Sequence, residues 1–158
     1  MSDLEVTIEN GIATFMMNRP DARNALSMDM RRQLAEALHD AELDDKIRCI
    51  VLKGAGDHFM AGGDIKGMGE SIKKSPEEIK KEFILRIHDL HPIMFAMRRM
   101  PKPIIASCRG AAAGAGVSIA LACDLVIAAE DAFFTLAYCK IGTSPDGSSS
   151  FHLPRAVG

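Results

Sequence analysis

The sequence has few of the features that mark specialised classes of protein. It contains no tryptophan and one tyrosine, and its four cysteines include no CxxC pair. This spacing favours reduced, mostly buried thiols over a disulfide framework or a zinc site. The 19 lysines and arginines are outnumbered by 21 acidic residues, which leaves a formal charge of −2. A broad basic surface for nucleic acids is therefore excluded, although a local basic patch is compatible with this composition.

Long apolar runs are absent as well. The uncharged stretch from Gly110 to Cys123 is too short for a membrane-spanning helix. The N-terminal sequence MSDLEVTIEN lacks the basic and apolar regions of a secretory signal. We therefore expect a cytoplasmic protein with no membrane contact. The 158 residues, 47% hydrophobic and 25% charged, are typical of one soluble domain spanning residues 1–158.

The first third of the sequence predicts two strands, a helix and a third strand. Leu4–Glu9 and Ile12–Met17 flank an Asn-Gly pair, which is a strong signal for a β-hairpin. Apolar residues then recur at helical spacing behind Ser27, a candidate N-cap, and predict a helix over Met28–Leu43. Ile47–Leu52 predicts a buried strand that runs into a glycine-rich loop. This order of elements is typical of α/β folds.

The remainder of the sequence repeats the alternation of helix and strand. Ser75 begins a capping box, and the apolar pattern predicts a long helix that Pro92 kinks or ends near His91. Further predicted elements are strands over Ile104–Cys108, Leu125–Ala129 and Phe133–Leu136, a short helix over Gly114–Cys123, and a last helix after SPDGSSS. Since the sequence reaches Gly158 only a few residues into that helix, we expect the domain to lack its C-terminal helical part.

Two glycine-rich segments follow predicted strands. One runs from Gly54 to Asp64, and the other runs from Arg109 to Gly116. Loops of this kind at helix starts present unpaired backbone N–H groups, which can bind an anion together with the positive end of the helix. Tight packing of helix against strand explains the same glycines equally well, and neither segment matches a Walker or Rossmann pattern. The residues alone leave both interpretations open.

Four motifs occur together in an order and spacing that resembles a known family. They are NRPDARNALS, HFMAGGDIKGM, RGAAAGAGVSIALACDLVIA and IGTSPDGSSSFHLPRAVG, and they cover nearly the whole chain. The sequence is similar to the N-terminal portion of the crotonase, or enoyl-CoA hydratase/isomerase, superfamily. The resemblance implies a spiral of repeated ββα units and an acyl-CoA thioester as substrate, with no further cofactor. It also implies assembly into homotrimers or dimers of trimers.

The resemblance implies an oxyanion hole for a thioester enolate. Its two backbone N–H donors correspond to Gly63 and Ala115, which lie in the two glycine-rich segments. Fixed donors of this kind can each contribute about 3–4 kcal/mol to the stabilisation of a transition state. Arg23 and Lys66 match positions that contact CoA phosphates in relatives, although most such side chains are simply solvated. No metal site is expected.

The acid and base residues decide which reaction the resemblance implies. The two glutamates of the family's hydratases correspond here to Ser118 and Tyr138, which are both neutral at pH 7, so a standard hydration is disfavoured. Asp146 matches the catalytic carboxylate of Δ3,Δ2-enoyl-CoA isomerases. Without the resemblance, an aspartate before Gly147 is more readily explained as a cap of the last helix. With it, the sequence predicts an enoyl-CoA isomerase of fatty-acid or related acyl-CoA metabolism, with Asp146 as its catalytic residue.

Other functions stay open at this point. One is a hydratase-like enzyme that uses atypical residues, and another is a non-catalytic homologue that binds acyl-CoA. A dehalogenase would use Asp146 as a nucleophile, but in that branch an indole lies beside the substrate ring. The present chain has Tyr138 there and no tryptophan, so this alternative is disfavoured.

Overall fold

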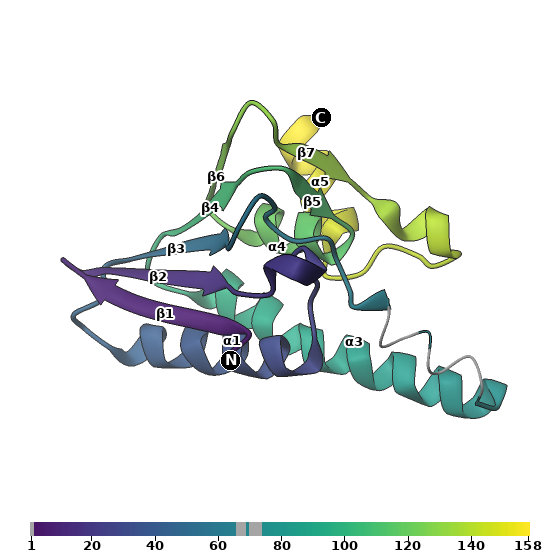
Figure 1. Ribbon diagram of the computed structural model, residues 1–158. Coiled ribbons are helices and arrows are strands. Elements are labelled where there is room, and N and C mark those ends of the chain that lie inside the picture. The colour runs from purple at the N-terminus through teal and green to yellow at the C-terminus, as the bar shows by residue number, and fades with distance from the viewer. Residues whose placement is uncertain (1, 66–68, 70–73) are drawn as a thin grey trace.

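The computed structural model describes residues 2–65, 69 and 74–158, and a five-stranded sheet organises them. The strands follow the order β1 (Leu4–Glu9), β2 (Ile12–Met17), β3 (Cys49–Gly54), β4 (Ile104–Cys108) and β6 (Leu125–Ala128). The first pair is antiparallel and the other pairs are parallel. A smaller parallel sheet joins β5 (Ala111–Ala113) to β7 (Phe133–Thr135). Figure 1 shows the smaller sheet beside the larger one.

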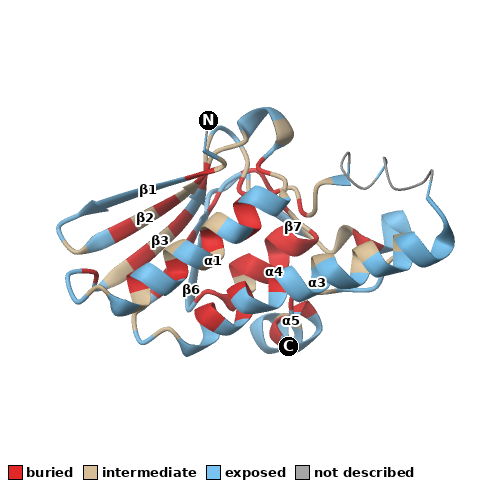
Figure 2. Ribbon diagram, turned by 90° about the horizontal axis from the view of Figure 1, so that it is seen from below, coloured by how far each residue is buried: buried red, intermediate tan, exposed pale blue. Residues whose placement is uncertain are grey.

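The helices complete a repeating pattern of two strands and a helix. The described helices are α1 (Met28–Leu43), α3 (Pro76–Arg99), α4 (Ala115–Ala122) and α5 (Ser149–Val157), with short 3-10 helices η1 (Pro20–Ala22) and η3 (Ala137–Ile141). The order β1-β2-α1 recurs as β4-β5-α4 and β6-β7-α5. Helices α1 and α3 lie side by side across one face of the larger sheet (Figures 1 and 2). The predicted α/β class is confirmed.

Local signals in the sequence place several elements correctly. The hairpin has the predicted bounds, and so does α1, whose N-cap Ser27 accepts a hydrogen bond from the Met30 N–H. Ser75 forms the predicted capping box with Glu78. The third strand begins at Cys49, two residues later than predicted, because the Ile47 N–H donates to the Asp44 carbonyl in the turn after α1.

Helix α3 corrects one alternative of the prediction for Pro92, because the helix does not end near His91 and continues through Pro92 to Arg99. A proline inside a helix has no N–H for the carbonyl one turn earlier, here that of His88, and usually kinks or ends the helix. The turns beyond Pro92 are nevertheless held in place by burial, since Ile93 and Met97 are almost inaccessible to solvent. Burying one such side chain contributes about 1.5–3 kcal/mol, which is enough to offset the missing hydrogen bond.

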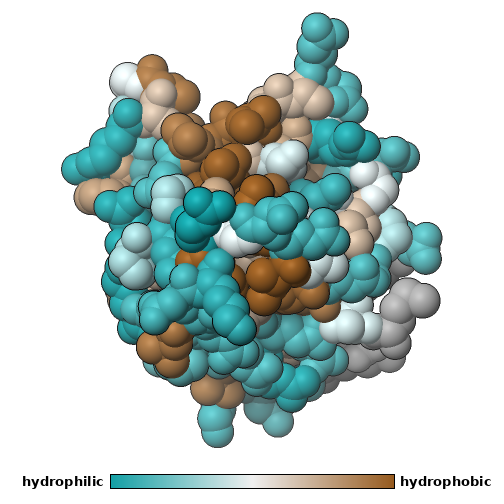
Figure 3. Space-filling view, turned by 90° about the vertical axis from the view of Figure 1, so that its left-hand side faces the viewer, coloured by the Kyte–Doolittle hydropathy of each residue, from teal (hydrophilic) through white to brown (hydrophobic). Residues whose placement is uncertain are grey.

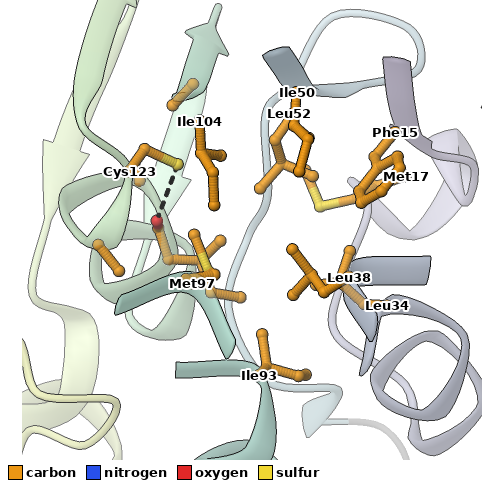
Figure 4. Packing of buried hydrophobic residues seen from close by; sticks show 14 of the residues in the cluster. Phe15, Met17, Leu34, Leu38, Ile50, Leu52, Ile93, Met97, Ile104 and Cys123 are labelled. Carbon is orange, nitrogen blue, oxygen red and sulfur yellow. Dashed lines mark hydrogen bonds between the residues drawn. The ribbon is translucent and has the colours of Figure 1, made fainter. Parts of the chain in front are cut away.

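The main core lies between the larger sheet and helices α1 and α3. Figure 4 shows side chains of both helices pointing toward side chains of β2, β3 and β4. The labelled residues of these elements are Phe15, Met17, Leu34, Leu38, Ile50, Leu52, Ile93, Met97 and Ile104. This packing fixes the sheet and therefore the loops that leave the carboxyl ends of its strands.

The last two strands are largely exposed, as is β1 beyond Leu4. Every residue of β6 is exposed, including Leu125 and Ile127, and so are Phe133 and Phe134 of β7. Apolar side chains are visible on the face shown in Figure 3. Within the described ranges, none of the helices is both long and apolar enough to cross a membrane.

The four cysteines are free thiols, and two of them are buried. Burial raises the pKa of Cys108 to about 11, and it also raises the pKa of Cys123. Both thiols therefore stay protonated and unreactive near neutral pH. Cys49 is partly buried, and Cys139 is exposed. The expectation of buried thiols is therefore confirmed for Cys108 and Cys123, and it is wrong for Cys139.

Candidate functional site

A cavity of about 730 Å³ lies where the chain segments that follow β3, β5 and β7 meet. This volume is in the usual range for small-molecule sites. The apolar part of the wall consists of Ala61, Ile65, Phe83, Ile87, Ala137 and Ile141. Its ionisable side chains are Arg31, Arg86, His91, Tyr138, Lys140 and Asp146. Gly63 and Ala115 also line the cavity. Together with Asp146, three of the predicted site residues therefore line the same cavity.

One side of the cavity is made of backbone. Residues 60–63 lie between two other segments, to which they are joined by four hydrogen bonds. On one side, the Met60 N–H donates to the Ala111 carbonyl (3.0 Å) and the Ala113 N–H donates to the Met60 carbonyl (2.9 Å). On the other side, the Ala61 N–H donates to the Arg23 carbonyl (2.9 Å) and the Leu26 N–H donates to the Gly62 carbonyl (2.7 Å). This pairing holds the two glycine-rich segments beside each other.

Gly62 shows how closely these two segments approach. Its φ of +98° is strained for any other residue, and a Cβ there would lie 2.9 Å from the Ala113 carbonyl oxygen and 3.7 Å from the Ala115 nitrogen. The peptide units around Gly63 and Ala115 are therefore neighbours. No side chain fits between them at Gly62.

The N–H groups of Gly63 and Ala115 are available for a ligand. In the described part of the chain, neither group donates to a protein acceptor. Ala115 is also the first residue of α4, where the helix dipole adds positive potential. Two fixed donors of this kind can stabilise negative charge that develops on an oxygen between them.

The other side of the cavity is made of side chains. The Tyr138 hydroxyl, on η3, donates to Oδ1 of Asp146 over 2.6 Å. Ser118, on α4, lies 3.0 Å from the Tyr138 hydroxyl and donates to the Asp146 carbonyl over 3.0 Å. Gly147 permits this arrangement, because its φ is +56° and a Cβ there would lie 2.7 Å from the Ser118 Cβ. The three residues form one hydrogen-bonded group.

The electrostatics of this group keep Tyr138 neutral. Burial raises the pKa of Tyr138 above its ordinary value, and the hydrogen bond to Asp146 raises it further. The phenol therefore acts as a hydrogen-bond donor to the carboxylate and not as a base. The alternative that Asp146 caps the last helix is not what the structure shows, since α5 has no side-chain cap and only the Asp146 carbonyl accepts from Ser149.

The two residues predicted to contact CoA phosphates are not brought into the cavity. Arg23 is exposed, has a left-handed backbone at φ +50°, and does not line the cavity, although its carbonyl is bonded to Ala61, which does. Lys66 lies outside the described residues. Among the residues that the structure does describe, no group of three or more His, Cys, Asp or Glu side chains could hold a metal ion.

The cationic residues of the cavity, Arg31, Arg86 and Lys140, were not predicted from the sequence. Arg31 had a visible signal, because it lies on the apolar stripe of α1 with Leu34 and Leu38, where a charged residue is unusual. Arg86 and Lys140 had no such signal, since each is an ordinary charged residue in its segment. The bond between Tyr138 and Asp146 also escaped prediction, because it depends on the loop between η3 and α5 folding back.

Comparison with known proteins identifies the family to which the chain belongs. The family model described as enoyl-CoA hydratase/isomerase matches residues 7–158. The 1,2-epoxyphenylacetyl-CoA isomerase of Escherichia coli (strain K12) is 38% identical over 96% of this chain and 56% of its own length. A 4-chlorobenzoyl coenzyme A dehalogenase of Arthrobacter sp is also 38% identical, over 99% of this chain and 56% of its own length.

The fold comparison agrees with the sequence comparison. The crystal structure of an enoyl-CoA hydratase from Polaromonas sp. JS666 superposes with a TM-score of 0.87 at 38% identity, and the match covers 98% of this chain and 59% of that one. The chain thus spans somewhat more than half the length of these relatives. With a family model that matches nearly every residue and a shared three-dimensional structure, the chain belongs to the enoyl-CoA hydratase/isomerase family of the crotonase superfamily.

Proposed function

We propose that the protein is an enoyl-CoA isomerase that moves a double bond of an acyl-CoA thioester by a carboxylate-mediated proton shift. The observation that carries this proposal is the position of Asp146. Among the described residues that line the cavity it is the one acidic side chain, and it shares that cavity with the available N–H groups of Gly63 and Ala115. The name of the Escherichia coli relative supports an isomerase of a CoA thioester, although its substrate is an epoxide and not a 3-enoyl group.

The proposed reaction needs one base and one oxyanion site. Asp146 removes a proton from C2 of a 3-enoyl thioester, and the electron pair of that C–H bond delocalises onto the thioester oxygen. The N–H groups of Gly63 and Ala115 stabilise the resulting enolate. Asp146 then returns the proton at C4, which leaves the double bond between C2 and C3. One carboxyl group serves first as the base and then as the acid, and the proton that it carries exchanges with solvent, so no second acid is required.

The neighbouring hydroxyl groups suit a single-carboxylate mechanism. Tyr138 holds Oδ1 of Asp146, and across the described residues no side chain donates to Oδ2, which leaves that oxygen for the substrate. Ser118 and Tyr138 occupy the positions at which the family resemblance implies glutamates in hydratases. Because both are neutral hydroxyl groups, they cannot activate water as carboxylates do.

Proton NMR of a 3-enoyl-CoA in deuterated buffer tests the proposal. We expect the wild-type protein to convert the substrate to the conjugated 2-enoyl thioester with deuterium incorporation, and Asp146→Asn to bind the thioester without converting it. Asp131→Asn, a change at an exposed aspartate outside the cavity, is the matched control and should retain the activity.

The same experiment separates the alternatives. Formation of a 3-hydroxyacyl thioester would identify a hydratase with atypical residues. Binding without any exchange or movement of the double bond would identify a non-catalytic homologue. Halide release from 4-chlorobenzoyl-CoA, followed in parallel, would assign Asp146 to nucleophilic chemistry. Each of these results contradicts the isomerase.

The setting of the enzyme is part of the proposal. A role in acyl-CoA metabolism, such as that of fatty acids, follows from the proposed substrate, and a trimer or a dimer of trimers follows from the family resemblance. The cytoplasm is the proposed location. Arg23 and Lys66 are proposed contacts of the CoA phosphates. Light scattering coupled to size exclusion measures the assembly directly, and a monomer would contradict this part of the proposal.

A further inference from the structure

Arg31 is a charged side chain buried in the wall of the cavity. It lies on α1 with only 5% of its surface exposed, among apolar residues such as Met30 and Leu34. Its guanidinium donates through Nη1 to the Arg86 carbonyl on α3, whereas its buried Nε has no hydrogen-bond partner. No carboxylate of the described residues lies within 4.0 Å of it. Arg31 therefore has a buried charge without an ion-pair partner.

Such a charge is costly to bury. Burial lowers the pKa of Arg31, and the positive charge of Arg86 lowers it further, against the opposite influence of Asp146 and Asp89. Buried charges in proteins are normally paired, because an unpaired one loses its hydration without compensation. Arg31 lines the cavity, so a molecule bound there can supply the missing partner.

The surroundings of Arg31 select the sign of that molecule. Arg86 and Lys140 line the same cavity, and among the described residues of its wall Asp146 is the acidic one. This part of the wall is therefore mostly positive and favours an anion. A guanidinium binds a carboxylate through two parallel N–H···O bonds, and such charge-assisted pairs are stronger than neutral ones.

We propose that Arg31 binds a carboxylate at the far end of the acyl chain, so that the preferred substrates are thioesters of dicarboxylic acids. This inference rests on the proposed function in one respect, because it assumes that the thioester carbonyl binds between Gly63 and Ala115. The carboxylate then extends along the cavity to Arg31 while the reacting carbons face Asp146. The phosphates of CoA itself are the other anions that Arg31 can meet.

Binding of saturated thioesters tests the inference without requiring any reaction. Calorimetry compares ω-carboxyacyl-CoAs, from succinyl-CoA to suberoyl-CoA, with the fatty acyl-CoAs of equal chain length. We expect at least one dicarboxylic thioester to bind about tenfold more tightly than its fatty acyl counterpart, since one hydrogen-bonded charge pair accounts for that ratio. The chain length of the thioester that binds most tightly then indicates the distance from the thioester site to Arg31.

Variants of Arg31 locate the preference. Arg31→Met should abolish the preference for the carboxylate, and Arg31→Lys, which keeps the charge, should retain part of it. Arg32→Met is the matched control, because Arg32 is exposed and pairs with Asp29 on the outer face of α1. If Arg31→Met does not fold, the comparison of thioesters on the wild-type protein and on Arg31→Lys still decides the question.

Three results would overturn the inference. One is tighter binding of the fatty acyl thioester at every length, and another is an unchanged carboxylate preference in Arg31→Met. The third is an equal loss of affinity for both series in Arg31→Met, which would assign Arg31 to the CoA phosphates or to the joint between α1 and α3. Failure of the isomerase is distinct from these, because it would show as bound thioester that exchanges no deuterium.

Discussion

The two sides of the cavity are built on different principles. The side formed by residues 60–63 and 113–115 presents peptide N–H groups that backbone hydrogen bonds and close packing hold in place. The side formed by Ser118, Tyr138 and Asp146 presents functional groups on side chains that hydrogen-bond to one another. The backbone groups of the first side cannot move without disturbing the fold. The side chains of the second side can be replaced while the fold is kept. Mutations should therefore affect stability and activity together on the first side, and activity alone on the second.

The largest effect on activity should come from the side-chain side. Asp146→Asn removes the proposed base and should lower kcat by about two to four orders of magnitude. Thermal unfolding should show little change, because the amide has the same shape and can still accept from Tyr138. A large drop in Tm would show that Asp146 is part of the fold, and the contrast between the two sides would then be lost.

A change on the backbone side should reduce stability and activity together. Gly62→Ala adds a Cβ at a φ of +98° and 2.9 Å from the Ala113 oxygen, which should cost about 1–3 kcal/mol of folding free energy. A shift of the neighbouring N–H groups should also reduce kcat. Gly69→Ala is the control, since a Cβ there meets nothing within 4 Å. Normal activity in a destabilised Gly62→Ala protein would contradict the proposed oxyanion site.

Tyr138→Phe should sharpen the comparison, because it keeps the Asp146 carboxylate but removes the hydrogen bond that Tyr138 donates to it. Loss of one hydrogen bond to a charged group should lower kcat about tenfold, with KM nearly unchanged. Ser118→Ala should have a smaller effect, because Ser118 bonds to neutral oxygens of Tyr138 and Asp146. Steady-state kinetics measures both, and an equal loss in the two variants would show that the residues act only through packing.

The smallest expected effect is a change in the pH dependence of stability. The pKa of Tyr138 is raised by burial and by its bond to Asp146, so the native protein keeps a proton that the unfolded chain releases near pH 10. The free energy of unfolding should therefore fall as the pH rises above about 10, by up to about 1.4 kcal/mol per pH unit from this group.

Melting curves from neutral pH to pH 11 measure this effect. Tyr138→Phe should have the shallower decline, since it has no phenol to titrate. The thiol of Cys108, with a pKa of about 11, contributes equally to both proteins and cancels in the comparison. Equal slopes would show that the Tyr138 phenol is not held in its neutral form.

Local patterns predicted the elements of this fold better than they predicted the contacts between them. Asn-Gly and Ser27 act over a few residues, so the hairpin and α1 have the expected bounds. The strand β5 escaped prediction because Ala-Ala-Ala has no alternation, and it forms only by pairing with β7. Pro92 does not end α3, as one alternative had it, because the burial of Ile93 and Met97 outweighs the local preference.

The candidate site divides in the same way. The family resemblance pointed to Gly63, Ala115 and Asp146, and all three line one cavity. The group of Ser118, Tyr138 and Asp146 needed the fold, because its members lie 8 to 28 residues apart in sequence and meet only when the last loop closes over α4. Arg31 was visible in the sequence as a charge on an apolar stripe, but its burial was not.

Pro92 also divides α3 into two parts of unequal protection. The residues before it, down to Pro76, are mostly exposed, and that half of the helix projects past the sheet in Figure 1. After it, Ile93, Met94, Ala96 and Met97 are in the core. Since the proline interrupts the hydrogen-bond ladder, amide hydrogens of the outer half should exchange with solvent sooner than those of the inner half. The outer half includes Phe83, Ile87 and His91 of the cavity wall, so local opening there would change the cavity while the core stays folded.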